Sequence, residues 1–323
     1  MSVQPTSFSL PLADHPSIYV LHENEEWLVP LRQAFNDLHI PFQEWFLHEG
    51  RLPLDQEPPQ GVFYNRMSAS SHTRGHRYSA EFTAPVLAWL EAHGRRVVNG
   101  RRALQLEIGK AEQYLQLQAH GVRVPRTVVV SGREQLLQAA REFDERPFIV
   151  KPNRGGRGLG VQLFHTVEEL SDSVPAIDEL SLDGLALVQQ YVKPAHGTIT
   201  RLEFIGGRFF YAVQVDATDG FELCPADSCT VDDAFCPAPG QNKPNKFTLD
   251  AGFSDPDLIR RLEAFFADNH IEVGAAEFVE APDGARYVYD VNVNTNYNQQ
   301  AEKEAGNDRR AMHRLASFLR DEL

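Results

Sequence analysis

One run of the sequence has residue types suited to binding phosphate groups, Lys151-Pro-Asn-Arg-Gly-Gly-Arg-Gly-Leu-Gly160. Its glycines let backbone N–H groups approach an anion, and Lys151, Arg154 and Arg157 offer positive charge to the same anion. Apolar strands are expected on both sides, at residues 147–151 and 161–164, so the run is neither a Walker A loop nor a Rossmann fingerprint, both of which open a helix. The pattern predicts a flap over phosphates; the alternative is a flexible surface loop with ordinary charges.

A second cluster combines Glu277 with the run Asp290-Val-Asn-Val-Asn294. Residues two apart in a strand share a face, so the polar residues of this run point the same way. If residue 280 pairs with residue 285 across a four-residue loop, Glu277 pairs with Val288 and faces the same side, unless a bulge breaks the alternation. Carboxylate and amide oxygens suit Mg²⁺, which also borrows oxygens from substrate phosphates. The alternative is a solvated polar face, but asparagine is a poor strand former and the intervening valines are typical of a core.

Alternating strands and helices must position these clusters. Strands at residues 17–21, 42–47, 61–64 and 96–99, with helices at 26–38 and 82–93, predict a parallel sheet flanked by helices. One helix is expected over residues 104–118, and hairpins are expected at 200–216 and 273–293. Residues 257–269 and 305–323 are expected to be helical, and residues 221–246 show no clear period. The fold class is therefore α/β, with an antiparallel sheet near the C-terminus.

The ordered set of motifs resembles the ATP-grasp superfamily, and most closely its ribosomal-protein glutamate ligase (RimK-type) branch. The resemblance covers most of the chain. Lys110 is similar to the family's helix lysine, and Lys151 with the run up to Gly160 is similar to its strand lysine and flap. Gln189-Gln190-Tyr191-Val192 is similar to its adenine hinge, and Arg201 to the arginine that follows the hinge. The family's metal ligands are similar to Glu277, Asp290 and Asn292, and two N-terminal strand ends are similar to Asn65-Arg66-Met67-Ser68 and Val97-Val98-Asn99.

The resemblance implies an ATP-grasp fold in three parts. Residues 1–105 would form an N-terminal Rossmann-like (pre-ATP-grasp) domain, residues 106–192 a small central α+β lid with the glycine-rich loop, and residues 193–323 a C-terminal antiparallel-sheet domain carrying the metal-binding hairpin. ATP would lie between the last two parts.

The resemblance also implies a role for each matched residue. The ATP-binding residues would be Lys110, Lys151, Gly155, Gly156, Gly158, Gln189, Gln190, Tyr191 and Val192. Glu277, Asp290 and Asn292 would hold Mg²⁺ between the β- and γ-phosphates. Arg201, Lys151 and Arg66 would be the catalytic residues, with Arg201 steadying the transferred phosphoryl group. For Lys110, a helix lysine that would otherwise be read as solvent-facing, only the resemblance suggests a role.

The activity implied is ligation of a carboxylate to an amine through an acyl phosphate, with release of ADP and phosphate. The substrates would be small molecules or peptides, with an amino acid or peptide as the carboxylate or the amine. A phosphotransferase with the same nucleotide grip and a noncatalytic nucleotide-binding regulator are the alternatives. The complete set of lysines and metal ligands argues against the regulator.

Two residues depart from the family pattern. The hinge acid is replaced by Gln190, so an amide stands where a carboxylate usually contacts the nucleotide. The metal ligands Glu277 and Asp290 are reversed in length relative to the commoner order, although their total charge is unchanged. Base or ribose preference is therefore open, whereas magnesium binding is still expected.

Residues 63–78 carry five cationic or titratable side chains directly after an expected strand: Arg66, His72, Arg74, His76 and Arg77. Ligands of parallel sheets bind outside the carboxyl ends of the strands. The segment is therefore a candidate site for an anionic substrate such as an amino-acid or peptide carboxylate. A charged surface loop is the alternative.

Composition excludes several other classes of protein. The formal net charge of −14 argues against a nonspecific nucleic-acid binder. The sequence has no apolar run of about 20 residues, so no membrane span is expected. The N-terminus lacks the pattern of a signal peptide. Cys224, Cys229 and Cys236 show no CxxC spacing, so we expect thiols in a reducing cytoplasm rather than a metal centre or a disulfide framework. The sequence leaves open whether the chain forms a homo-oligomer, as a dimer or a tetramer.

Overall fold

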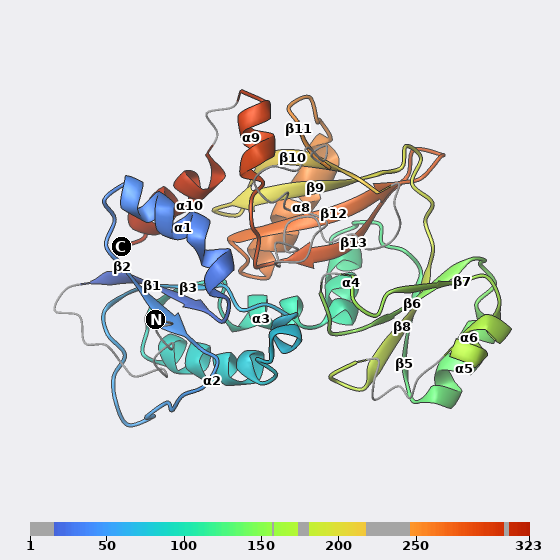
Figure 1. The fold of residues 1–323 in the computed structure, drawn as a ribbon, viewed down its shortest axis with the longest axis horizontal. Coiled ribbons are helices and arrows are strands. Elements are labelled where there is room, and N and C mark those ends of the chain that lie inside the picture. The colour runs from blue at the N-terminus through green and yellow to red at the C-terminus, as the bar shows by residue number, and fades with distance from the viewer. Residues whose placement is uncertain (1–15, 157, 174–180, 218–245, 307–309) are drawn as a thin grey trace, which may run out of the picture.

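The computed structural model describes residues 16–156, 158–173, 181–217, 246–306 and 310–323. These residues form three sheets, each with its own helices (Figure 1). The cysteines of the aperiodic segment, and Arg157 of the glycine-rich run, lie outside the described residues.

The N-terminal sheet is parallel, with the order β2-β1-β3-β4. Residues that alternate along β1 face two different cores: Ile18 and Val20 pack toward α1, whereas Tyr19 and Leu21 pack toward α2. Strands buried on both faces in this way are typical of parallel sheets with helices on each side. The elements are β1 (Ser17–His22), α1 (Glu25–Asp37), β2 (Phe42–Phe46), β3 (Gly61–Asn65), a 3-10 turn η1 (Ser71–Arg74), α2 (Ser79–Ala92) and β4 (Arg96–Val98).

The expected helix over residues 104–118 is wrong, because two helices occupy that stretch. They are α3 (Arg101–Glu107) and α4 (Lys110–Ala119), and Gly109 between them has non-helical backbone angles. In α4, Gln113, Tyr114 and Leu117 are buried, while Leu115 is 64% exposed. A helix that restarts at Lys110 places this lysine in its first turn.

The central sheet is antiparallel, with the order β5-β8-β6-β7, and α5 covers one face of it. Its core is small and separate from the others, centred on Leu136, Phe143, Phe148 and Val188. Its elements are β5 (Thr127–Ser131), α5 (Arg133–Glu142), β6 (Phe148–Pro152), β7 (Gln162–Phe164), α6 (Val167–Ser173) and β8 (Leu185–Gln190).

The third sheet is antiparallel, with the order β11-β10-β9-β12-β13. The edge strand β11 follows residues 221–246, which show no clear period, and the sequence did not predict it. The terminal helix begins at Ala311 rather than at residue 305, after a separate short helix that starts at Gln299. The elements are β9 (Thr198–Ile205), β10 (Arg208–Asp216), β11 (Phe247–Asp250), α8 (Pro256–Asp268), β12 (Val273–Glu280), β13 (Arg286–Asn292), α9 (Gln299–Glu304) and α10 (Ala311–Asp321).

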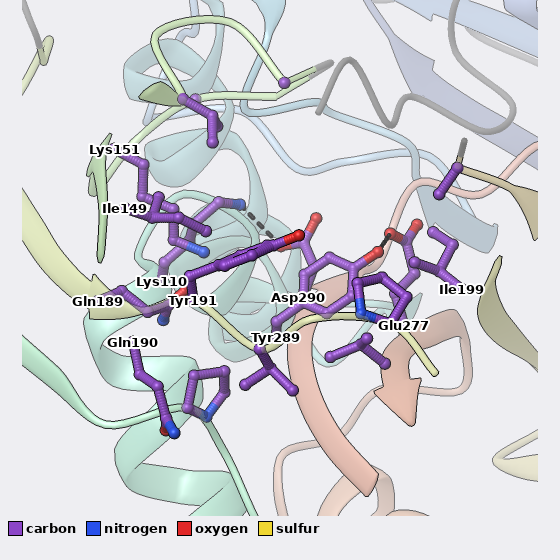
Figure 2. Close-up of a pocket in the computed structure, with 18 of the residues that line it drawn as sticks. Lys110, Ile149, Lys151, Gln189, Gln190, Tyr191, Ile199, Glu277, Tyr289 and Asp290 are labelled. Carbon is purple, nitrogen blue, oxygen red and sulfur yellow. Dashed lines mark hydrogen bonds and ion pairs between the residues drawn. The ribbon is translucent and has the colours of Figure 1, made fainter. Parts of the chain in front are cut away.

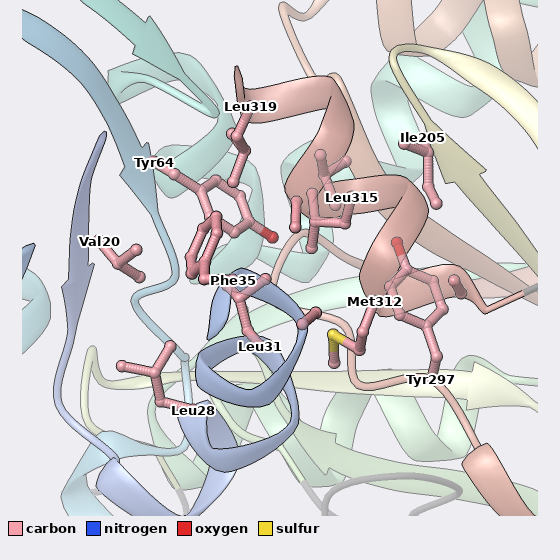
Figure 3. Close-up of a cluster of buried hydrophobic side chains, with 14 of the residues drawn as sticks. Val20, Leu28, Leu31, Phe35, Tyr64, Ile205, Tyr297, Met312, Leu315 and Leu319 are labelled. Carbon is pink, nitrogen blue, oxygen red and sulfur yellow. The ribbon is translucent and has the colours of Figure 1, made fainter. Parts of the chain in front are cut away.

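Helix α10 joins the first sheet to the third. It lies beside α1 (Figure 1), and its buried face, with Met312, Leu315 and Leu319, meets Tyr64 of β3 and Ile205 of β9 (Figure 3). Each of these side chains contributes about 1.5–3 kcal/mol when fully buried. The shared core fixes the carboxyl edge of the parallel sheet against the strands of the third sheet.

Candidate active site

A cavity of about 370 Å³ lies between the central and third sheets. Most of the residues singled out in the sequence line it, from elements far apart in the chain (Figure 2). They are Lys110, Lys151, Gly155, Gly156, Gly158, Gln189, Gln190, Tyr191, Val192, Arg201, Glu277, Asp290 and Asn292. Arg66 does not line this cavity.

Two lysines form the cationic wall of the cavity. Lys110, in the first turn of α4, places its Nζ 2.7 Å from Oδ1 of Asp290. Burial lowers the pKa of Lys110, but the charge of Asp290 outweighs it and the pKa ends above its ordinary value. Lys151, on β6, donates to the hydroxyl of Tyr114 at 2.6 Å. Burial, and then the nearby charge of Lys110, lower the pKa of Lys151 to about 7.

The carboxylates Glu277 and Asp290 face each other across β12 and β13, but not in the expected register. Glu280 pairs with Arg286, not with residue 285, and a bulge between Phe278 and Glu277 skips Tyr289. These two shifts bring Glu277 opposite Asp290 instead of Val288. Both residues therefore share a sheet face, as expected, although for a different reason. The bulge also turns Tyr289 so that its hydroxyl donates to Glu277 at 3.0 Å (Figure 2).

Arg201 occupies the middle strand of this face and is almost fully buried. Its Nη1 donates to Glu277 at 2.8 Å and its Nε donates to Glu203 at 2.6 Å. The third nitrogen, Nη2, donates to the hydroxyl of Thr295 at 2.6 Å. A guanidinium held by two carboxylates has a fixed direction, which suits a charge that must sit at one point of the cavity wall.

The oxygens on this wall fit a hard divalent cation. Burial raises the pKa of Asp290, but the Lys110 ammonium outweighs it and keeps that carboxyl ionised. Asn292 donates its Nδ2 to Glu277 at 3.1 Å, so its amide oxygen is directed elsewhere. Among the described residues no three acidic, histidine or cysteine side chains converge as a metal site. Two carboxylates and one amide match Mg²⁺, which keeps waters and takes phosphate oxygens, better than a metal that needs a complete protein cage.

Another part of the cavity lining, at the end of β8 and directly after it, is apolar and amide-rich. Gln189 is buried and its Nε2 donates to Thr127 Oγ1 at 2.8 Å. Gln190 lines the cavity, and its side-chain oxygen accepts the backbone N–H of Arg126 at 3.2 Å. Tyr191 and Val192 follow directly on the wall. Apolar walls with a few fixed polar groups are the usual surroundings of a flat heterocycle.

The glycine-rich run covers one side of the cavity through Gly155, Gly156 and Gly158. Arg154 was expected to offer its charge to the same anion as Lys151, but its side chain does not line the cavity. It turns away and donates to both oxygens of Glu81 on α2, at 2.6 and 3.2 Å. A Cβ at Gly156 would lie only 3.0 Å from the Cβ of Ser70, so the run touches the N-terminal part there and has no room for a side chain.

The cationic segment after β3 is largely internally paired. Arg74 and His76 contact the buried carboxylate of Glu23, and Arg77 contacts Glu81. Arg66 alone within this set of arginines contacts no carboxylate among the described residues; its partners are neutral oxygens near Asn294. The structure therefore separates Arg66 from the other arginines of the segment.

Sequence reasoning missed three supporting residues. Tyr114 stands four positions after Lys110 on one helix, a spacing that could have indicated a shared face. Tyr289 needed the bulge, which has no sequence signal. Glu107 is buried and accepts the backbone N–H groups of Ala69 and Val293, at 3.1 and 2.8 Å. Burial raises the pKa of Glu107 to about 7.

None of the helices in the described ranges is long and apolar enough to cross a membrane.

Comparison with known proteins gives a consistent picture. Residues 109–222 match the family model of the RimK-like ATP-grasp domain. The mouse N-acetylaspartylglutamate synthase A is 28% identical over 64% of this chain and 54% of its own length. The human beta-citrylglutamate synthase B is 33% identical over 42% of this chain and 35% of its own length. The chain thus spans about half or less of the length of these relatives.

Solved structures extend the likeness of the fold to nearly the whole chain. The D-cycloserine synthetase DcsG superposes with a TM-score of 0.63 at 20% identity, over 94% of this chain and 99% of that one. The observed sheets, the cavity between the second and third of them, and the matched domain all point to one family. The chain has the ATP-grasp fold, and residues 109–222 match the family model of the RimK-like ATP-grasp domain.

Proposed function

We propose that the protein is an ATP-dependent ligase that joins a carboxylate to an amine, with release of ADP and phosphate. The observation that carries the proposal is the arrangement of one cavity wall. Lys110, Lys151 and Arg201 line the cavity together with Glu277 and Asp290, and the hinge Gln190-Tyr191-Val192 supplies a more apolar part of the same lining. Triphosphate charge fits the charged part and a base fits the hinge.

The lysines bind and orient the phosphates. Lys151 is held under Tyr114 with a lowered pKa, and an arriving phosphate would restore its positive charge. Lys110 is already charged and paired with Asp290, so it bridges the metal-side carboxylate and the phosphates. The backbone N–H groups of Gly155 and Gly156 close over the same anion and exclude water, which shields a short-lived acyl phosphate.

The acidic wall would hold magnesium. Glu277, Asp290 and Asn292 are its proposed ligands, and the ion would neutralise charge that builds up on the transferred phosphoryl group. Arg201 is fixed beside Glu277 and is proposed to stabilise the same group. At the hinge, the backbone near Tyr191 and Val192 would read the base edge, and Gln190 would offer an amide in place of the usual acid. Arg66 does not line the cavity, so no role in phosphoryl transfer is proposed for it.

We also propose that the three sheets correspond to three domains with boundaries at residues 105 and 192. The enzyme is proposed to work in the cytoplasm, where ATP is abundant. The curated relatives are named as glutamate-joining synthases. Their names favour an amino acid as one substrate of this enzyme too.

Isotope transfer tests the reaction path. Pairs of acids and amines are first screened for magnesium-dependent phosphate release, and the product mass identifies the pair. The acid is then labelled with heavy oxygen in its carboxylate. Label in inorganic phosphate, together with ADP, is expected. Label in AMP with release of pyrophosphate would refute the acyl phosphate, and ADP formation with no amide product would favour a phosphotransferase.

A further inference from the structure

A small hollow outside the main cavity is lined by His22, Trp27, Arg66 and Asn294, with Asn24 and Leu28. It lies at the carboxyl end of β1, where parallel sheets bind ligands. Its enclosed volume is about 10 Å³, room for roughly one water-sized atom. A single ligand oxygen therefore fits, while the rest of the ligand would stay outside the hollow.

Arg66 is buried beside this hollow without a counter-charge. It is 2% exposed, and all four hydrogen bonds described for it go to neutral oxygens. Its Nε donates to Asn294 Oδ1 at 3.1 Å, its Nη2 to Thr295 O and Asn296 Oδ1 at 3.1 and 2.6 Å, and its Nη1 to Trp27 O at 3.3 Å. A guanidinium has five N–H groups, so one remains. Burying a charge without an opposite one is costly, which indicates that a bound anion supplies it.

Three carboxylates of the same part of the molecule are engaged with other residues. Glu23 contacts Arg74 and His76, and Glu203 contacts Arg201 and Thr295. Glu44 lies 3.4 Å from Nε2 of His22 and contacts Arg32 at 2.6 Å. In the part of the chain that the structure describes, none of these acids contacts Arg66.

Two further buried ring nitrogens, on residues that line the same hollow, lack partners. The indole N–H of Trp27 and Nδ1 of His22 have no hydrogen bond within the described residues, although both side chains are at least nine-tenths buried. An N–H of this kind left unpaired costs about 1–3 kcal/mol. The unpaired indole N–H and the spare guanidinium N–H belong to two residues that line one hollow, so the hollow favours an anionic oxygen over a cation.

We propose that this hollow is the carboxylate-recognition subsite of the enzyme and binds a carboxylate of one substrate through Arg66 and Trp27. The proposal rests on the proposed ligase function and adds to it the class of substrate. Asn294 lies two residues beyond Asn292, so the chain between them spans at most about 7 Å. A short molecule could therefore place one carboxylate in the hollow and its reacting group near the metal-side wall. The substrate class is a small amino acid or dicarboxylic acid, with Arg66 acting in recognition.

Nuclear magnetic resonance of the indole N–H groups tests the subsite without nucleotide. The full-length chain labelled at tryptophan gives three indole signals, from Trp27, Trp45 and Trp89, and Trp27→Phe assigns the first. Acetate, succinate and L-glutamate are titrated, with acetamide as the neutral match of acetate. The Trp27 signal is expected to shift downfield with the acids only. The Trp89 signal should not move, because its indole already donates to Gln56 O at 2.9 Å.

Three variants sharpen the result. Arg66→Gln should weaken carboxylate binding at least tenfold, while Arg77→Gln, in the same segment but paired with Glu81, should not change it. Asn294→Asp keeps the oxygen that Arg66 contacts and supplies the missing negative charge. It should fold, raise the melting temperature and abolish the response to acetate. This variant decides the question if Arg66→Gln does not fold.

An unmoved Trp27 signal at tens of millimolar acid, an equal shift with acetamide, or full carboxylate binding by Asn294→Asp would overturn the subsite. The ligase proposal would survive those results, because ADP formation is measured separately. Conversely, a carboxylate-specific Trp27 response in a chain that never forms ADP would keep the subsite and refute the ligase.

Discussion

Replacing Lys151 by methionine should stabilise the nucleotide-free protein by an amount that depends on pH. Burial and the neighbouring Lys110 lower the pKa of Lys151 from its ordinary 10.5 to about 7. Between these values the unfolded chain holds a proton that the folded chain lacks, so wild-type stability rises with pH across this window. At about 1.4 kcal/mol per pKa unit, burial of the lysine costs about 5 kcal/mol below pH 7 and almost nothing near pH 10.5.

The methionine variant has no such cost, but it loses the hydrogen bond to the Tyr114 hydroxyl at 2.6 Å. That loss, about 1 kcal/mol, does not vary with pH in this range. The variant should therefore be more stable than wild type by about 4 kcal/mol at pH 6.5, and the difference should shrink by about 3 kcal/mol by pH 9.5. Nucleotide binding should be weaker in the variant, since the positive charge proposed to meet the phosphates is gone.

Urea unfolding of the nucleotide-free protein at pH 6.5, 8 and 9.5 measures the difference. Lys110→Met is the matched control. Its ammonium has a raised pKa because Asp290 contacts it, so its removal should destabilise the protein at all three pH values. The loss should be smallest at pH 6.5, because removing Lys110 also relieves its repulsion of protonated Lys151. A difference between Lys151→Met and wild type that stays constant within about 1 kcal/mol would refute the reasoning.

Three further predictions follow from buried contacts. Asn99 has a left-handed backbone (φ 57°), and its side chain donates to Val273 O and Val293 O and accepts the N–H groups of Glu272 and Val273. Asn99→Leu should therefore lower the free energy of unfolding, measured by thermal unfolding, by about 4 kcal/mol. A loss under 1 kcal/mol would contradict this account. Asp290→Asn removes a charge from the proposed magnesium wall and should lower turnover at least a hundredfold; near wild-type activity across magnesium concentrations would show the assignment wrong. Glu81→Gln releases Arg154 and should speed amide exchange at residues 155 and 156, measured by mass spectrometry with Arg101→Gln as a surface control; unchanged exchange would mean that this ion pair does not hold the run.

Local sequence was sufficient for most elements and for the composition of the cavity wall. The period of apolar residues predicted the parallel sheet, both hairpins and α8, because that period reports which face of an element is buried. The sequence also pointed to Lys151 with its glycines and to Glu277 with Asp290 and Asn292. Glycines beside a lysine favour phosphate binding, and carboxylates with an amide on one strand face favour a metal ion. The side on which Glu277 faces was also predicted, although the register used to reach it was wrong.

Only the tertiary structure decided which of these residues meet one another. Lys110, at the start of α4, meets Asp290, 180 residues away along the chain. Arg154 and Arg66 carry the same charge in the sequence, yet one pairs with Glu81 and the other is buried without an acid. Residue type and spacing along a chain set what a side chain can do, because they fix its chemistry and its face. Its partner is set by contacts between distant segments, since charge and burial act through space, and no local pattern encodes those distances.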